Sequence, residues 1–375
     1  MKTIILKDSL RNGLVIVSRI APKNLSLPIL SSALLSCEKN FVCLRTTDLE
    51  IGIKWWALAK VEREGKIACP LRVFQNLIDS LSVEKITLKT EEKSLFIETD
   101  NEVFRAQIKG MDPEEFPIIP EPETKEVLVI KIPEFVSGLS RVVEMAAVSM
   151  VKPEISGVYF RFSDNLLKMV ATDSFRLAQD TISLENRVEK EIAFILPQRS
   201  CREIINIFGD KQGELKIYLS TNQILLETMM TETNHPKIHF FSRLIDGEYP
   251  NYQEIIPHEF RAKAVLSRSE FLQNLKTASL FSNKINEVKI ILRPEKQEIE
   301  TQTQSQEVGQ SSSILKVKIE GEASEVSFNW RFLIDGLSQI KDKEITFALS
   351  KDDGPALLQP KEDENYLYLL MPLRT

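Results

Sequence analysis

The side chains that most often carry out catalysis or hold metal ions are scarce in this sequence, and their spacing fits no catalytic pattern. Two of the three histidines, His235 and His239, stand four positions apart with Pro236 between them. Their segment is strand-like, which argues against a metal-binding pair on one face of a helix. The sequence also contains no GxSxG, P-loop or GxGxxG motif. We therefore expect that the protein is not an enzyme and uses no metal ion or other cofactor.

Two aspartates and the cysteines could also do chemistry, but structural roles explain them better. Asp48 and Asp173 end equivalent strand-like segments, where a turn role is favoured over paired catalytic carboxylates. No CxxC pair occurs among the four cysteines, which are Cys37, Cys43, Cys69 and Cys201. We expect them to be buried, reduced thiols. The N-terminus lacks a signal-peptide pattern, so a cytoplasmic protein is expected.

The charge balance limits any role in nucleic-acid binding. The chain has 375 residues and a net charge of −6, whereas proteins that neutralise phosphates are usually basic. Hydrophobic residues make up 43% and charged residues 27%, which is typical of a folded, soluble protein. No uncharged apolar run approaches the roughly 18 residues that span a membrane. A DNA-binding function would therefore require that basic residues gather on one surface and acidic residues elsewhere.

A weak internal repeat of about one-third of the chain supplies the elements that could build such a surface. Each repeat opens with an amphipathic helical segment, the first over about residues 6–21. Strand-like runs follow at residues 31–53, 157–180 and 287–302, and we expect turns at 38–40 and 163–165. A second helical segment follows at residues 69–81, 195–208 and 328–340. The repeats predict an α+β protein of three similar domains, each with two helices packed on one face of an antiparallel sheet.

The domain boundaries follow from similar closing segments. The sequences GMDPEEFPIIP and DGEYPNYQEIIP end at Pro120 and Pro257. We expect domains at residues 1–122, 123–257 and 258–375. Residues 301–313, TQTQSQEVGQSSS, are polar and free of aromatic residues, so we expect a mobile surface loop inserted in the third domain. A tolerated insertion is the simpler interpretation, and a functional role stays open.

Basic residues recur on the polar faces of the six helical segments, whereas acidic residues concentrate in turns. Each second helix has an arginine near its start, at Arg72, Arg199 and Arg331. Ordinary solvated helix faces would explain any single case. If the repeats are related by rotation, the basic faces merge into one surface that holds DNA through phosphates without reading bases. The expected DNA-facing residues are Lys7, Arg11, Arg72, Arg141, Arg199, Arg202, Lys276 and Arg331.

Five motifs along nearly the whole chain resemble the bacterial DNA polymerase III beta subunit family of DNA sliding clamps. They are LPIL at 27–30, TTDLEIGI at 46–53, ATDSFRLA at 171–178, DGEYPNYQEIIP at 246–257 and YLLMPLRT at 368–375. The resemblance implies that each chain forms half of a closed ring. The ring would be a head-to-tail homodimer that encircles double-stranded DNA without sequence preference and acts as a processivity factor in DNA replication.

The resemblance also implies sites. Phe104, Leu280 and Phe281 match the dimer interface, with domain core as the alternative. Lys23 could replace a DNA-contacting arginine whose position holds Asn24 here. A pocket would bind peptide motifs of the replicative DNA polymerase, the clamp loader and other partners. Its matching positions are Ile155, Thr172, Ser174, Phe175, Arg176, Leu177, Pro250, Ile255, Ile285, Phe332, Leu369, Met371, Pro372, Leu373 and Arg374.

Three positions in or near this expected pocket depart from the family pattern. The family often has Gly-His where this chain has Ser174-Phe175, and a basic residue where it has Glu254. Partner preference is therefore expected to differ while the site itself persists. The rival function is a DNA-independent scaffold that binds peptides. The recurring basic helices argue against that scaffold, and DNA loading that falls steeply with salt would separate the two functions.

Overall fold

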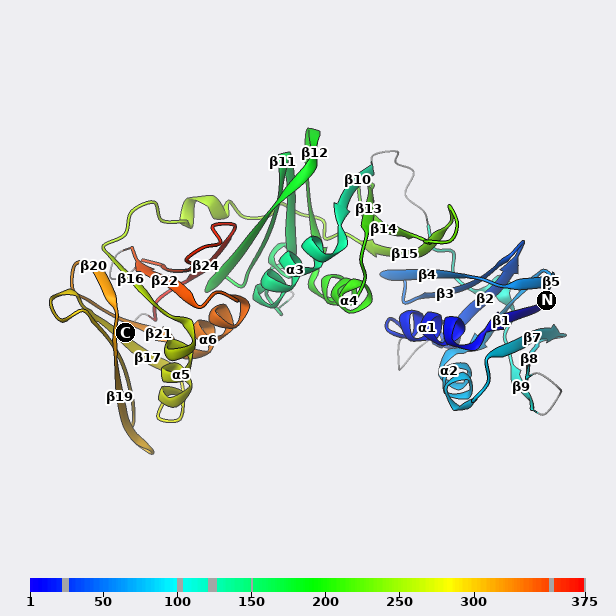
Figure 1. The fold of residues 1–375 in the computed structure, drawn as a ribbon, viewed down its shortest axis with the longest axis horizontal. Coiled ribbons are helices and arrows are strands. Elements are labelled where there is room, and N and C mark those ends of the chain that lie inside the picture. The colour runs from blue at the N-terminus through cyan, green and yellow to red at the C-terminus, as the bar shows by residue number, and fades with distance from the viewer. Residues whose placement is uncertain (22–26, 100–103, 121–126, 150, 351–353, 374–375) are drawn as a thin grey trace. The chain divides into compact units, whose positions relative to one another are not determined.

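The computed structural model describes residues 1–21, 27–99, 104–120, 127–149, 151–350 and 354–373 (Figure 1). The chain forms two compact units. The first unit combines Met1–Pro133 with Glu203–Leu244, and the second combines Glu134–Arg202 with Ile245–Thr375. The second repeat thus contributes strands to both units. Within the described residues, no helix is both long and apolar enough to cross a membrane.

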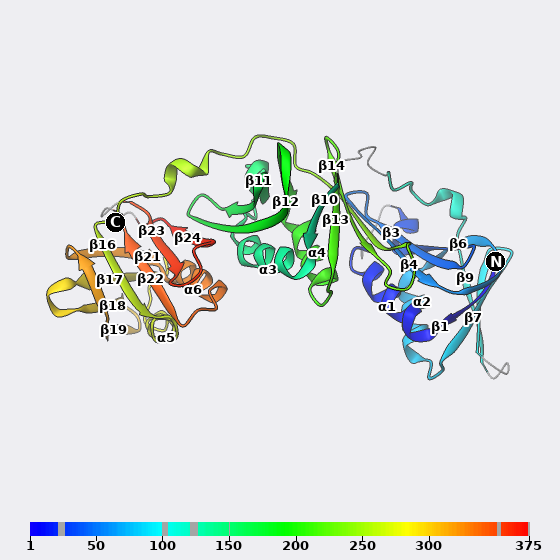
Figure 2. The same cartoon turned by 45° about the horizontal axis from the view of Figure 1, so that its top comes forward.

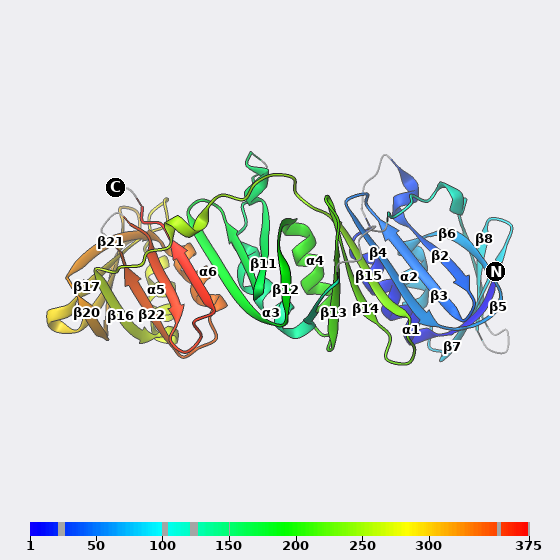
Figure 3. The ribbon, with the colours of Figure 1, turned by 90° about the horizontal axis from the view of Figure 1, so that it is seen from above.

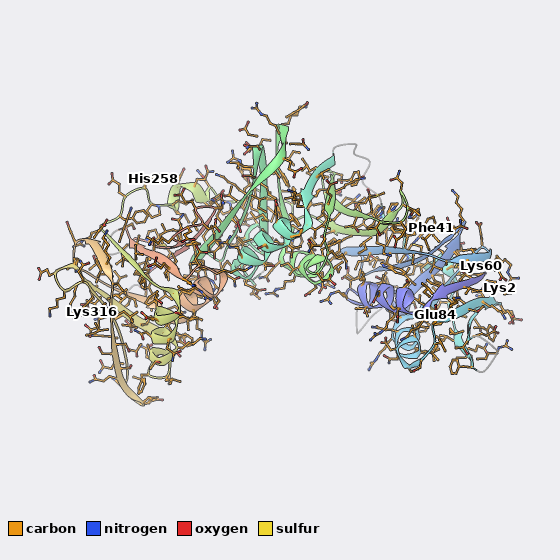
Figure 4. The ribbon with its side chains drawn as sticks, in the orientation of Figure 1. Lys2, Phe41, Lys60, Glu84, His258 and Lys316 are labelled. Atoms are coloured by element: carbon orange, nitrogen blue, oxygen red, sulfur yellow. The ribbon has the colours of Figure 1, made fainter. Side chains whose placement is uncertain are left out.

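The first unit contains two antiparallel sheets. The five-stranded sheet has the order β5(Lys60–Arg63)-β1(Lys2–Leu6)-β7(Lys85–Glu91)-β8(Ser94–Thr99)-β9(Arg105–Lys109). Lys2 and Lys60, on its neighbouring strands β1 and β5, are labelled in Figure 4. The eight-stranded sheet has the order β10(Val127–Lys131)-β13(Glu214–Leu219)-β14(Gln223–Met229)-β15(Pro236–Arg243)-β4(Ile51–Leu58)-β3(Phe41–Thr47)-β2(Ser32–Glu38)-β6(Gly65–Pro70). The β15–β4 ladder makes one continuous sheet from strands of the first and second repeats.

Helices α1(Lys7–Ser18) and α2(Leu71–Ser80) pack beside each other against this unit (Figure 2). The buried face of α1 consists of Leu10, Gly13, Leu14 and Val17, which confirms the predicted amphipathic spacing. Gly13 permits close packing, because a Cβ there would meet the Trp55 ring at 2.4 Å. Seen from above, β2, β3, β4 and β6 spread side by side over the two helices (Figure 3).

The second unit repeats this plan. Its seven-stranded sheet has the order β11(Gly157–Thr172)-β12(Arg176–Pro197)-β24(Tyr366–Leu370)-β23(Ala356–Pro360)-β22(Glu344–Leu349)-β16(Ala262–Ser267)-β20(Lys318–Gly321). Its four-stranded sheet has the order β19(Gly309–Lys316)-β18(Glu298–Ser305)-β17(Glu287–Arg293)-β21(Ser324–Asn329). The β12–β24 ladder joins strands of the second and third repeats into one sheet. Helices α5(Arg268–Ser279) and α6(Trp330–Gln339) pack together in this unit.

The remaining helices, α3(Ile132–Val142) and α4(Gln198–Phe208), occupy the predicted positions of the second repeat. Both bury the apolar residues that the sequence placed on one face, among them Phe135, Leu139, Cys201 and Ile204. All six predicted helical segments are confirmed as α-helices. All four cysteines are buried and free, as expected, and burial raises the pKa of Cys69 to about 12.

One of the two predicted turns is confirmed. Strands β2 and β3 pair around residues 39–40, where Lys39 has a φ of 52°, in the left-handed region that short polar turns use. The prediction of a hairpin turn at 163–165 is wrong, because β11 continues through these residues and pairs with β12 on both sides of them. The chain makes a bulge there instead: Asp164 has a φ of 51° and the pairing register shifts on both sides of it.

The prediction of a mobile loop at residues 301–313 is wrong. This segment belongs to strands β18 and β19, which pair in register from Glu298↔Lys316 to Ser305↔Gly309. Thr301 and Thr303 are buried, and the Thr303 hydroxyl donates to the Ala278 carbonyl of α5 at 3.0 Å. Thr suits a strand with one covered face, whereas the Gln and Ser side chains occupy the open face. The polar composition therefore reflected a solvated sheet face. Lys316, at the end of this hairpin, is labelled in Figure 4.

Candidate functional site

The ATD motif of the second repeat builds a tight turn between β11 and β12. The Thr172 hydroxyl donates to the Arg176 carbonyl at 2.6 Å. The Asp173 carboxylate accepts the backbone N–H groups of Phe175 and Arg176, each at 3.0 Å. Ser174 has a φ of 77°, in the left-handed region that favours glycine. These bonds hold the exposed side chains of Ser174 and Phe175 at the tip of the turn.

The first repeat forms the same turn between β3 and β4. The Thr47 hydroxyl donates to the Ile51 carbonyl at 2.8 Å, and Asp48 accepts the N–H groups of Glu50 and Ile51 at 3.0 and 2.7 Å. Leu49 has a φ of 78°. The turn role that the sequence predicted for both aspartates is therefore confirmed. The neighbouring strand adds a further bond here, because the Arg243 N–H donates to the Glu50 carbonyl at 3.0 Å.

Arg176 links this turn to helix α6. Its guanidinium donates to Asp173 at 2.9 Å and to Asp335 at 2.5 Å, and its central carbon lies 4.5 Å from the centre of the Phe332 ring. Burial by itself would lower the pKa of Arg176, but Tyr368 and the two carboxylates hold that pKa above its ordinary value. A fully charged guanidinium, fixed by two carboxylates and a ring, makes a rigid wall for a binding surface.

The C-terminal segment runs along the other side of the turn. After β24, the Met371 N–H donates to the Phe175 carbonyl and the Leu373 N–H to the Ser327 carbonyl, both at 2.8 Å. Met371, Pro372 and Leu373 are half-buried. The tail, the turn and Arg176 are thus held together by backbone hydrogen bonds rather than by side-chain contacts alone.

The residues expected to form the pocket fall into a buried group and an exposed group. The buried members Ile155, Leu177 and Leu369 belong to one apolar core cluster together with Tyr249 and Tyr252. Thr172 is also buried, and Phe332 is half-buried. The exposed members are Ser174, Phe175, Pro250, Ile255 and Ile285.

Three of these exposed members have large apolar side chains, with Phe175 at 61%, Ile285 at 57% and Ile255 at 48% exposure. Arg374 lies outside the described residues. Of these three, Phe175 adjoins the fixed cation Arg176 in the turn, and an exposed ring next to a cation suits a short amphipathic peptide.

The expected DNA-facing residues fall into three groups. Arg72, Arg199, Lys276 and Arg331 are exposed. Arg11 pairs with Asp79 of α2 at 2.8 Å, and Arg202 makes two bonds to Glu144 at 3.0 and 2.6 Å. Lys23 lies outside the described residues.

Two residues of this set are not presented to solvent as expected. The side chain of Lys7 is only 15% exposed, and its amine lies 3.8 Å from Asp8. Arg141 is 17% exposed and lies between two carboxylates, Asp180 at 3.2 Å and Asp363 at 2.8 Å. The expectation for Arg141 is therefore corrected, because its guanidinium turns inward to the sheet. Helix periodicity gave the right face for its Cα but not the direction of a long side chain.

The residues expected at a dimer interface belong to different units, Phe104 to the first and Leu280 and Phe281 to the second. Phe104 directly precedes the edge strand β9 and is half-buried, and its carbonyl accepts the Thr99 N–H at 3.2 Å. Leu280, which directly follows α5, is 71% exposed, and Phe281 is half-buried. These residues are not fully buried in the single chain, and their role at an interface stays a prediction.

The chain matches three family descriptions over most of its length. The N-terminal domain of the DNA polymerase III beta subunit matches residues 1–120, the central domain residues 132–251 and the C-terminal domain residues 253–374. The chain therefore belongs to the DNA polymerase III beta subunit family, the DNA sliding clamps.

Curated relatives and solved structures agree. The beta sliding clamp of Synechococcus elongatus is 27% identical over 381 residues, which cover 100% of this chain and 99% of the relative. That of Bacillus subtilis is 25% identical over 386 residues, with 100% of both chains covered. The solved Bacillus subtilis DNA polymerase sliding clamp has a TM-score of 0.93 at 25% identity and covers 100% of this chain and 99% of that chain. The DNA polymerase III beta subunit from Thermotoga maritima has a TM-score of 0.90 at 26% identity, with the same coverage. The three-domain α+β clamp fold is thereby confirmed.

Several structural partners of the site were not found from the sequence. Asp335 and Ser327 bond to the site from α6 and β21, and Asp363 reaches Arg141 from the turn before β24. A terminal apolar strand could have suggested that β24 joins a sheet. Nothing local in the sequence marks Asp335 or Asp363 among the many surface acids.

Proposed function

We propose that this sliding clamp closes around duplex DNA as a head-to-tail homodimer and tethers a replicative DNA polymerase to its template. The clamp domains would be residues 1–122, 123–257 and 258–375, so that two chains supply six domains. In this proposal the protein works in the cytoplasm, is not an enzyme and needs no cofactor.

One observation carries the DNA part of the proposal. Arg72, Arg199 and Arg331 are each the second residue of a helix, in α2, α4 and α6, and all three are exposed. Cations are disfavoured in the first turn by the helix dipole, so an arginine at the same place three times calls for a role beyond helix stability. Phosphate contact is such a role, since a helix N-terminus and a guanidinium both attract phosphate without reading bases.

The seam between the two chains would join the first unit of one chain to the second unit of the other. Phe104 lies beside edge strand β9, and Leu280 and Phe281 follow α5. Burial of these apolar side chains in a partner chain would remove exposed apolar area from water and give a stable contact. The rival function, a DNA-independent peptide scaffold, accounts for neither this seam nor the three equivalent arginines.

The partner-binding part rests on the surface formed by the turn, Arg176 and the C-terminal tail. Met371 offers a flexible apolar side chain that accommodates varied anchors, and Arg176 offers a fixed cation for a backbone carbonyl or an acidic flank. The partners proposed for this surface are peptide motifs of the replicative polymerase, the clamp loader and other clamp-binding proteins.

The test of encirclement is retention on DNA of different topology. The protein is loaded by a clamp loader onto nicked circular duplex and onto the same duplex made linear, and the bound fraction is followed through gel filtration. Encirclement predicts retention on the circle and rapid loss from the linear form. Equal loss from both forms would refute the ring. Failure to bind either form of the DNA at any salt concentration would favour the scaffold function.

A further inference from the structure

A partly buried ion cluster lies at the start of strand β24. The Arg141 guanidinium, which comes from α3, bonds to Asp180 of β12 at 3.2 Å and to Asp363 before β24 at 2.8 Å. Its central carbon also lies 4.2 Å from the centre of the Tyr366 ring, at the first residue of β24. Three segments far apart in the sequence thus meet at one cation.

The backbone near the cluster is arranged to bring these groups together. A Cβ at Gly138 would lie 2.4 Å from the Met169 methyl group and 3.3 Å from an Asp180 oxygen, so α3 approaches β11 and β12 closely. The Thr181 N–H donates to the Asn365 carbonyl at 3.0 Å, and the Asn365 N–H to the Asp363 carboxylate at 3.0 Å. The turn before β24 is therefore shaped to present Asp363 to Arg141.

The cluster and the partner-binding surface lie at opposite ends of one ladder. Strands β12 and β24 pair in register from Asp180↔Tyr366, beside the cluster, to Arg176↔Leu370, beside the surface. Met371 follows directly and donates its N–H to the Phe175 carbonyl at 2.8 Å. A slip of one residue in this ladder would turn every side chain of β24 to the other face of the sheet and displace Met371.

We infer that Arg141, Asp180 and Asp363 are positioning residues for the partner-binding surface, because they fix the register of β24 and thereby the place of Met371 and Leu373. This inference rests on the proposed function of that surface. The charged groups lie at the point where the strand begins, and their ionic contacts are made in one register only, which adds to the apolar packing that already disfavours a one-residue slip. Fixing register is the best-attested use of buried polar groups.

The cluster is not arranged for maximal stability. The Arg141 Nε and the Tyr366 hydroxyl are buried and have no hydrogen-bond partner among the described residues. Burial also raises the pKa of Asp180 to about 6, against the opposing effect of Arg141, so its carboxylate is not in its most favourable environment. A cluster that leaves such groups unsatisfied is better explained by the geometry it enforces.

The test compares two substitutions of the same kind in the second unit. Arg141→Met removes the cluster cation and leaves a shorter, unbranched apolar side chain. Arg161→Met is the matched control, because Arg161 makes a comparable pair with Glu191, at 3.0 and 2.9 Å, on strands β11 and β12 away from β24. Affinity is measured by fluorescence titration with a labelled polymerase-derived clamp-binding peptide. Arg141→Met should weaken binding at least tenfold, Arg141→Lys less, and Arg161→Met not at all.

Hydrogen exchange reports the tail directly. The Met371 and Leu373 amides should exchange at least tenfold faster in Arg141→Met, while amides in the core of α5 keep their wild-type rates; a general loss of stability would raise both. Equal affinity and equal tail exchange in Arg141→Met would overturn the inference.

If Arg141→Met does not fold, Asp363→Asn, which keeps the shape and removes one ionic contact, takes its place with a smaller expected change. Failure of the wild-type protein to bind the peptide would count against the proposed function, whereas the exchange comparison would still decide the positioning role.

Discussion

The ion pair that Arg202 of helix α4 makes with a carboxylate should weaken the affinity of the clamp for DNA. Arg202 of α4 makes two bonds to Glu144, at 3.0 and 2.6 Å, and both side chains are about half exposed. A phosphate must compete with this carboxylate for the same guanidinium. The substitution Glu144→Gln removes the competing charge and leaves the size of the side chain unchanged.

The size of the expected change in DNA affinity depends on how many arginines become available to contact phosphate. An exposed ion pair is worth up to about 1 kcal/mol, so freeing Arg202 should tighten binding to a short duplex by up to about fivefold. One additional phosphate contact steepens the logarithmic salt dependence by about 0.9. Between about 50 and about 200 mM salt, the variant should therefore lose roughly three- to fourfold more affinity than the wild-type protein.

The assay is fluorescence anisotropy with a labelled duplex over a salt series. Glu191→Gln is the matched control, because it changes the net charge by the same amount but frees Arg161 on a strand rather than on a helix. An unchanged salt slope in Glu144→Gln would refute the reasoning. An equal increase in Glu191→Gln would show that net charge alone, and not the helix arginine, controls the affinity.

Three further predictions concern the seam, the tail and the packing of α6. Phe281→Asp should convert the dimer to monomers, since a charge would be buried at the seam; analytical ultracentrifugation that finds an intact dimer would argue against the assignment. The double change Met371→Ala with Leu373→Ala should weaken partner-peptide binding at least tenfold without lowering the melting temperature, as titration and calorimetry can show. Gly336→Ala should destabilise by about 1–3 kcal/mol, because its Cβ would lie 2.5 Å from the Tyr368 ring; a melting temperature equal to that of the wild-type protein would mean that α6 can shift freely.

The sequence predicted those parts of the fold that depend on local pattern. Apolar residues spaced for one helix face, such as Leu10, Leu14 and Val17, indicated the helices, and the Thr-Asp steps indicated the turns. These signals depend on neighbours a few positions apart, so a single sequence contains them. The segment 301–313 was misjudged because composition records polarity but not alternation between a covered and an open face.

The site was harder to predict because its contacts are long-range. Arg141 meets Asp363 across 222 positions of the chain (363 − 141) and Arg176 meets Asp335 across 159. No periodicity links residues so far apart, and each carboxylate resembles any surface acid. The positions in the Thr172–Leu177 turn and in the tail were reached through the family resemblance, and their binding role stays a prediction.

The turn between β3 and β4 and the turn between β11 and β12 have the same backbone arrangement but carry different side chains at their tips. Both have the same threonine and aspartate bonds. In both, the carbonyl of the third residue after the threonine accepts an N–H from another segment: Glu50 from Arg243, at the end of β15, and Phe175 from Met371, just after β24. One scaffold thus displays a carboxylate at one place and an aromatic ring at the other. A substitution at either tip can therefore change the side chain presented to solvent without removing any of these backbone hydrogen bonds.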